Sequence, residues 1–253
     1  MARQNHPFPF SGKLGKLSFF EHKVDGHMVR ERKGPSKKRL FNDPRYKLTR
    51  YAMSEFAEAG NAVTLVRDSI NEQLKGIADA RMISRITGLF REIVNTDAVN
   101  NIGLRKVSEG SLSPLNGFEF NAATALNQVL PKEVESSINR ATGLLSVQLP
   151  SLVPANEIKM PDGATHFEIL TIGAAYDFAG NKRIVVVNGT GKLPIDTNVL
   201  PARTLDHQLP ANSTDALFLF LGISFYTGGL NGFLEKMSNS VGNALKIINI
   251  DQA

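Results

Sequence analysis

The run Asn188-Gly-Thr-Gly-Lys-Leu193 is the sequence's nearest approach to a catalytic motif, because Gly-rich loops followed by Lys bind phosphate. A phosphate-binding loop also needs a glycine five residues before Gly191 and a Ser or Thr after Lys192. Val186 and Leu193 occupy those two positions. We therefore interpret this run as a β-turn rather than a nucleotide site.

The sequence also gives little support for nucleophilic or acid–base catalysis. His166 and His207 could act as bases, but the sequence has no Gly-x-Ser-x-Gly turn to present a nucleophilic serine. His166 lies in an alternating stretch whose opposite face carries Phe167 and Ile169, so we expect it to face solvent. Two acidic pairs lack a diagnostic spacing, namely Glu133 with Glu135 and Asp177 with Asp196. We expect no enzymatic activity and no catalytic residues.

Metal binding is equally unsupported. The chain has no cysteine, which excludes thiolate sites, disulfides and cysteine nucleophiles. His6, His22 and His27 cluster near the N-terminus, and the last two flank Asp25-Gly26. Two imidazoles on an exposed hairpin are more typical of solvated side chains than of metal ligands. We expect neither a metal nor another cofactor.

Positive charge is concentrated at the N-terminus. Residues 1–50 hold 13 Lys and Arg against 4 Asp and Glu, a net charge of +9, whereas the remainder holds 16 against 20, a net charge of −4. Such asymmetry predicts an acidic partner: nucleic acid, a membrane surface or the acidic face of another subunit. Aromatic residues interleave the basic ones, as they do in proteins that bind phosphates and stack bases.

The basic segment should be an arm and a hairpin. Pro7-Phe-Pro-Phe10 is predicted to be extended, because proline fixes φ and lacks an N–H. Asp25-Gly26 is typical of a type I′ turn joining strands at Lys16–Lys23 and His27–Arg32. Residues 33–39 contain Gly, Pro and Ser among four positive charges, which predicts a solvated loop.

Two helices should follow. Asn42-Asp-Pro44 favours a helix start, since Asp caps and Pro suits the first turn. A second helix is expected near 78–95. With so short a link the two helices either pack antiparallel as a hairpin, which we favour, or run on with a bend. Apolar residues of the first helix recur every three or four positions, at Leu48, Ala52, Phe56, Ala59, Val63, Val66, Ile70 and Leu74.

Beyond residue 100, short β-rich runs alternate with turn residues, which predicts an antiparallel sandwich or barrel. Ala216–Tyr226 has few polar residues and should be buried on both faces. Residues 123–129 could form a short helix or a strand. The fold class is therefore α+β, with an N-terminal β-hairpin and helical hairpin packed with a C-terminal sandwich. The expected strands are Leu104–Val107, Gly117–Asn121, Leu144–Leu149, His166–Ala174, Arg183–Val187, Ala216–Tyr226 and Ala244–Ile250.

Length and composition suit a globular protein of 253 residues with 42% hydrophobic residues. The first 16 residues lack the apolar core of a secretory signal, and no run approaches a membrane span. These features predict a cytoplasmic protein. We expect three segments, an arm and hairpin at 1–41, helices at 42–100 and a sandwich at 101–253.

The sequence resembles a family of uncharacterised proteins from Bacteroidota. The residues that carry this resemblance are Gly12-Lys-Leu-Gly-Lys-Leu-Ser-Phe19, Asp25-Gly26, the Arg-rich segment that follows, Asn42-Asp-Pro44, residues 50–57, Val153-Pro-Ala-Asn156 and Gly163-Ala-Thr-His-Phe167. The opening is also similar to small proteins of phage-like structural loci. These resemblances imply no activity and no catalytic residues.

Together these features predict a non-enzymatic assembly protein that forms rings or filaments through its basic arm, with self-association or other protein subunits as partners. The alternative is a nucleic-acid-binding protein that uses the same patch. In the first case the Phe residues and the charges would act on one protein surface. The expected partner-binding residues are Phe8, Phe10, Phe19, Phe20, Arg30, Arg32, Lys33, Lys37, Lys38, Arg39, Arg45, Lys47 and Arg50.

Overall fold

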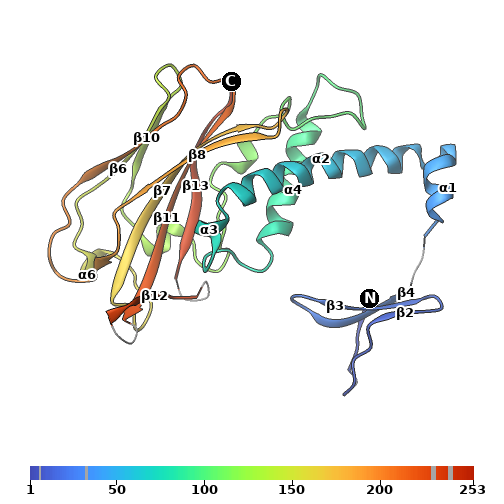
Figure 1. The fold of residues 1–253 in the computed structure, drawn as a ribbon, viewed down its shortest axis with the longest axis horizontal. Coiled ribbons are helices and arrows are strands. Elements are labelled where there is room, and N and C mark those ends of the chain that lie inside the picture. The colour runs from blue at the N-terminus through green and yellow to red at the C-terminus, as the bar shows by residue number, and fades with distance from the viewer. Residues whose placement is uncertain (6, 32–33, 229–231, 239–241) are drawn as a thin grey trace. The chain divides into compact units, whose positions relative to one another are not determined.

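The computed structural model describes residues 1–5, 7–31, 34–228, 232–238 and 242–253 (Figure 1). The chain divides into two compact units, the N-terminal unit Met1–Met53 and the C-terminal unit Ser54–Ala253. Helix α2 begins in the first unit and ends in the second.

The N-terminal unit contains a four-stranded antiparallel sheet in the order β1-β4-β3-β2. The expected hairpin forms, but its turn is longer than a type I′ turn. His22 pairs with Gly26, which leaves three residues in the turn, and only Gly26 has a positive φ, of 74°. Glycine adopts this left-handed conformation at little cost, as the end of such a turn requires. The strands are β1 (Ala2–Arg3), β2 (Gly12–Leu14), β3 (Leu17–His22) and β4 (Gly26–Glu31).

Helical structure begins earlier than predicted. Residues 37–39, which were expected to lie in a loop, form part of α1 (Lys37–Asn42), whose N-cap is Ser36. The predicted start at Asp43 is confirmed, because its carboxylate accepts a hydrogen bond from the Arg45 amide at the start of η1 (Pro44–Tyr46). Helix α2 (Lys47–Ser69) follows directly.

Two main helices cover one face of a sheet in the C-terminal unit, but they do not form the expected antiparallel hairpin. Figure 1 shows α4 (Met82–Thr96) crossing the direction of α2. The connection is longer than the sequence suggested, since it contains α3 (Asn71–Leu74) and a turn in which Gly76 has a φ of 72°. Ile70 and Ile77 are fully buried in this connection, so it is part of the core.

The C-terminal unit contains two antiparallel sheets. The larger has β11 (Ala216–Gly228) at its centre, paired with β7 (His166–Asp177) on one side and with β13 (Ala244–Asp251) and β12 (Leu234–Lys236) on the other. It is completed beyond β7 by β8 (Lys182–Gly189) and β9 (Leu193–Pro194). The smaller sheet has the order β10-β6-β5, with β5 (Glu135–Asn139), β6 (Leu144–Leu149) and β10 (Arg203–Gln208).

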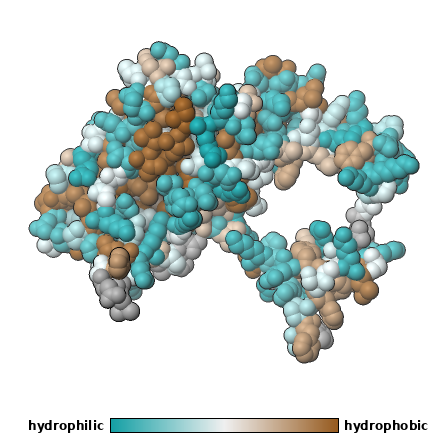
Figure 2. All heavy atoms as spheres, in the orientation of Figure 1, coloured by the Kyte–Doolittle hydropathy of each residue, from teal (hydrophilic) through white to brown (hydrophobic). Residues whose placement is uncertain are grey.

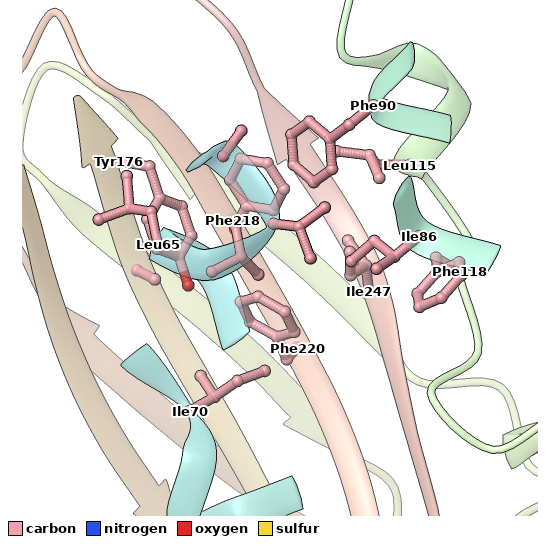
Figure 3. Close-up of a cluster of buried hydrophobic side chains, with 14 of the residues drawn as sticks. Leu65, Ile70, Ile86, Phe90, Leu115, Phe118, Tyr176, Phe218, Phe220 and Ile247 are labelled. Atoms are coloured by element: carbon pink, nitrogen blue, oxygen red, sulfur yellow. The ribbon is translucent and has the colours of Figure 1, made fainter. Parts of the chain in front are cut away.

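Strand β11 separates two hydrophobic clusters, as its apolar run predicted. Phe218 and Phe220 face the helices, where Tyr176 packs edge-on against Phe218 at 5.1 Å (Figure 3). Leu219 and Leu221 face the smaller sheet and pack with side chains such as Val147. The helices, the larger sheet and the smaller sheet therefore form layers around two shared cores.

The α+β class with antiparallel sheets is confirmed, and the larger sheet is curled (Figure 1). Residues 123–129, whose conformation the sequence left open, contain α5 (Leu126–Val129). The short elements η2 (Ser113–Leu115) and α6 (Pro154–Glu157) complete the fold. In the described part of the chain, no helix is both long and apolar enough to cross a membrane.

Two predicted strands do not form. Gly117–Asn121 makes only an isolated bridge, between Glu119 and Lys246, and Leu104–Val107 is a loop. The buried Asp97 carboxylate accepts hydrogen bonds from the amides of Val99 (2.8 Å), Asn100 (3.0 Å) and Lys106 (2.8 Å). These bonds satisfy backbone donors that a strand would use for pairing. The short β-rich run therefore folds around a side chain rather than into a sheet.

Candidate partner interface

The register of the N-terminal sheet separates its side chains into two different faces. Phe19 lies opposite Val29, and Leu14 lies opposite Leu17, so these four side chains share one face. We call Leu14, Leu17, Phe19 and Val29, together with Phe10, the apolar face. Phe10 joins it because its ring contacts the Phe19 ring edge-on at a centroid distance of 6.1 Å.

The other side of the sheet is basic. Phe20 lies opposite Met28, which in turn lies opposite Arg3, and Ser18 lies between Lys13 and Arg30. The Arg30 guanidinium lies over the Phe20 ring at 5.2 Å, a cation–π arrangement. We call Arg3, Lys13, Phe20, Met28 and Arg30 the basic face.

The apolar face has little cover within the described part of the chain. Leu14 is 71% exposed and Phe10 is 60% exposed, and no described residue of the N-terminal unit is buried. Figure 2 shows brown, apolar side chains at the surface of this sheet. Apolar surface that stays exposed to water forgoes the stabilisation that burial would give.

Gln4 holds the start of the chain against this sheet. Its backbone N–H donates to His27, while its side-chain amide donates to the carbonyls of Phe10 and Met28, both at 3.1 Å. The same amide oxygen accepts from the Phe10 N–H at 2.9 Å. Gln4 therefore fixes the segment that carries Phe8 and Phe10 beside the sheet, and Phe8 is 74% exposed.

Several predicted partner-binding residues around α1 already have intramolecular partners. Asp43 accepts from Arg45 at 2.9 Å and from Arg39 at 3.4 Å, and the hydrogen bonds from Arg45 lower the pKa of the Asp43 carboxyl. Arg50 donates to the carbonyls of Leu40 and Asp43. These arginines therefore stabilise the start of α2 through hydrogen bonds. Counting charges along the sequence could not show that they already have partners within the chain.

The predicted residues thus fall into separate groups rather than one patch. Phe10 and Phe19 meet on the apolar face, Phe20 and Arg30 meet on the basic face, and Lys37, Lys38 and Lys47 are exposed on α1 and the start of α2. Since Phe19 and Phe20 point to opposite sides, one flat partner surface cannot contact both. Arg32 and Lys33 lie outside the described residues.

Sequence reasoning missed Gln4, Leu14, Leu17, Met28 and Val29. The sequence predicted the two strands of the hairpin, but not the register that brings Leu14 and Val29 to the same face. Register depends on pairing between strands, which a single strand's pattern does not specify. The hairpin turn was the available signal, and its three-residue loop changes the pairing that a two-residue loop would produce.

The histidines considered as bases do not converge. His207 is fully buried, with its ring 3.1 Å from the Thr171 hydroxyl and 3.3 Å from the Leu145 carbonyl. Its Cβ sits over Gly173, whereas His166 lies seven residues away at the start of β7, about 23 Å along a strand. In the described ranges, no three His, Asp or Glu side chains are grouped as metal ligands.

Comparison with known proteins does not identify the chain. No protein-family model matches it, and no curated protein is significantly similar to it.

Proposed function

We propose that this protein is a non-enzymatic assembly protein whose N-terminal unit binds a neighbouring subunit. The assemblies would be homo- or hetero-oligomeric rings or filaments, as in phage-like structural complexes. The exposed apolar face is the observation that supports this proposal most directly. It offers hydrophobic surface in a unit that has no buried residue among those described.

Energetics favour a protein partner for that face. Burying apolar area contributes about 25 cal/mol per Å², so the three exposed side chains of this face, Phe10, Leu14 and Leu17, forgo several kcal/mol. Ordering the backbone costs about 1–2 kcal/mol per residue, and this unit recovers little of that by internal burial. A partner surface would supply the missing burial, while hydrogen bonds such as those of Gln4 would hold the sheet ready to bind.

Charge supports a head-to-tail arrangement. The N-terminal unit holds all the basic excess, with a net charge of +9 for residues 1–50, and the rest of the chain has a net charge of −4. Two N-terminal units would repel one another, whereas one N-terminal unit and the acidic remainder of a second copy would attract. Such heterologous contacts generate rings when they close and filaments when they do not.

The decisive experiment compares the full chain with a chain that lacks residues 1–40. All described buried residues lie in the C-terminal unit, so the shortened chain should remain folded. We expect light scattering to show an oligomer for the full chain, smaller at high salt, and a smaller particle for the shortened one. A salt-insensitive monomer in both forms would refute the proposal.

Point variants test the face rather than the segment. Leu14→Glu and Leu17→Glu place a charge on the apolar face and should lower the particle mass. Val24→Glu is the matched control, because Val24 is 40% exposed, like Leu17, but lies in the hairpin turn. Equal particle masses for all three variants and the parent would show that the apolar face is not the contact.

The basic face supports nucleic-acid binding as a second candidate function. Arg3, Lys13 and Arg30 surround Phe20 there, and such a surface could contact phosphates and stack a base. Filter binding of a duplex and a single strand should then give a log affinity that falls with log salt, and Arg30→Gln should reduce the slope. Absence of binding at low salt would exclude this function.

A further inference from the structure

The two edges of the larger sheet in the C-terminal unit differ in whether another segment is hydrogen-bonded along them. Beyond β13, residues 117–120 cover the edge with backbone hydrogen bonds: the Gly117 and Phe120 amides donate to Ile247 and Leu245, and the Ile247 amide donates to Phe118, at 2.8–3.0 Å. Proteins commonly cover an edge in this way because unpaired backbone groups attract other strands. This edge is closed.

The opposite edge, strand β8, has no strand hydrogen-bonded along it. Among the described residues, β8 pairs only with β7; β10 of the smaller sheet lies near the C-terminal end of β8, where the Asn188 side-chain amide donates to the Asp206 carbonyl at 3.3 Å. None of its eight residues is buried; Ile184 is 44% exposed and Val187 is 47% exposed. Figure 2 shows a broad brown area where Figure 1 labels β8. A long, apolar, unpaired edge strand is a pairing site for another strand.

The composition of β8 indicates which strand fits it. Its centre, Ile184-Val-Val-Val187, is a block of β-branched residues, with Lys182 and Arg183 at one end and Asn188 and Gly189 at the other. Antiparallel pairing with a second β8 would set the two basic ends far apart, each opposite uncharged residues of the partner. Parallel pairing would place like charges side by side, which is destabilising.

Symmetry restricts the register of such a pair. Two antiparallel strands of one continuous sheet are related by a two-fold axis perpendicular to the sheet, so one residue must lie opposite its own copy. The apolar block is then best paired when the axis passes through Val185 or Val186. With the axis at Val185, Val187 lies about four residues along the strand from its own copy, and with the axis at Val186 it lies about two residues away. In both registers the two Val187 side chains are too far apart to touch directly.

We propose that β8 is a second assembly contact, in which the β8 strands of two copies pair antiparallel about a two-fold axis at Val185 or Val186. The pairing would join two six-stranded sheets into one. It satisfies the outward backbone groups of both strands and covers the exposed apolar block. This contact involves neither the apolar face nor the basic face of the N-terminal unit.

The absence of cysteine from the chain makes a direct test possible. Directly opposed side chains in an antiparallel pair have Cβ atoms about 4.5–5.5 Å apart, close enough for a disulfide to form with small adjustment. Under mild oxidation of the full-length protein, either Val185→Cys or Val186→Cys should form a covalent dimer on a denaturing gel. Val187→Cys, on the same strand, should link far more slowly, and so should Val199→Cys, which is 66% exposed elsewhere in the same unit.

Charge variants provide an independent readout. Val187→Lys or Ile184→Lys should lower the particle mass at least twofold in light scattering, while Val199→Lys leaves it unchanged, with folding of each variant checked by its melting curve. Preferential linking through Val187→Cys, no linking at 185 or 186, or an unchanged mass in both lysine variants would overturn the proposal. Leu14→Glu disrupts the N-terminal contact instead and should leave the β8 disulfide intact, so the two proposals can fail separately.

Discussion

In the C-terminal unit, β11 is covered on both faces, whereas in the N-terminal unit no described residue is buried. Both units contain antiparallel sheets with well-paired strands. The difference lies in what packs against them, because hydrogen bonds alone contribute only about 1 kcal/mol each when they replace bonds to water. The comparison shows that the N-terminal sheet has paired strands but no buried core among its described residues. Under the assembly proposal, a partner would supply the missing burial.

Amide hydrogen exchange should show the largest difference between the two units. Amides of β7 and β11 should exchange only through global unfolding, while those of β3 and β4 should exchange through local opening at much lower free energy. The measurement is exchange followed by mass spectrometry on dilute protein, and again at high concentration. Protection in β3 and β4 equal to that in β11 in dilute protein would contradict the comparison.

Truncation of a phenylalanine should change the free energy of unfolding strongly in the C-terminal unit and hardly at all in the N-terminal unit. Phe218→Ala removes a fully buried ring that contacts Tyr176 and Phe220, and should lower the free energy of unfolding by about 3–5 kcal/mol. Phe8→Ala, at a ring that is 74% exposed, should change it by less than about 0.5 kcal/mol. Denaturant titration measures both. A large loss in Phe8→Ala would mean that the N-terminal unit contributes to the same cooperative transition.

Glycine variants sharpen the comparison within the C-terminal unit. A Cβ at Gly173 would lie 2.6 Å from the Cβ of His207, so Gly173→Ala should destabilise the fold by about 1–3 kcal/mol. Gly88, inside α4, has no neighbouring atom within 4 Å of such a Cβ. Gly88→Ala should therefore stabilise the protein by about 0.5–1 kcal/mol, because alanine favours the helix. Equal effects in thermal melts would show that close packing does not govern the β7–β10 contact.

The smallest effect concerns acid pH and the Asp97 loop. Burial would raise the pKa of Asp97, but hydrogen bonds from Asn100, Lys106 and Val99 outweigh it and hold the pKa below its usual range. A lowered pKa stabilises the folded state above the ordinary carboxyl pKa of 3.8, and this contribution is lost as the pH falls further. Parent and Asp97→Asn should therefore differ most near neutral pH and converge in acid. A constant difference between pH 7 and pH 2 would exclude this role of the carboxylate.

Local features of the fold could be predicted because their causes are local. The helix start at Asp43 needs only a capping carboxylate and a proline, and the turn at Gly26 needs only a residue that tolerates positive φ. The continuous apolar run of β11 predicted burial on both faces. By contrast, β5 and β10 were missed, since their polar alternation places only one face in a core and resembles an exposed loop.

The candidate interface was predictable only in part. The aromatic and basic residues of the N-terminus were identified, but their division between two faces follows from the register of Phe19 with Val29 and of Phe20 with Met28. The apolar stripe of α2 was also read correctly as a pattern, yet Leu48 is 72% exposed and Phe56 is 53% exposed, while Ala59 is fully buried. Periodicity shows which side chains share a face, but it does not show where the covering element ends.

The sequence by itself determined the helix cap at Asp43, the hairpin glycine, the charge asymmetry and the central strand. Tertiary structure alone decided which apolar residues are covered, which arginines donate hydrogen bonds to Asp43, and which edge of the larger sheet has no paired strand. The physical reason is that propensity, capping and charge depend on a few neighbouring residues. Burial and edge pairing depend on chain segments far apart in sequence, such as residues 117–120 beside β13. Among the described residues, no segment pairs in this way with the outer edge of β8.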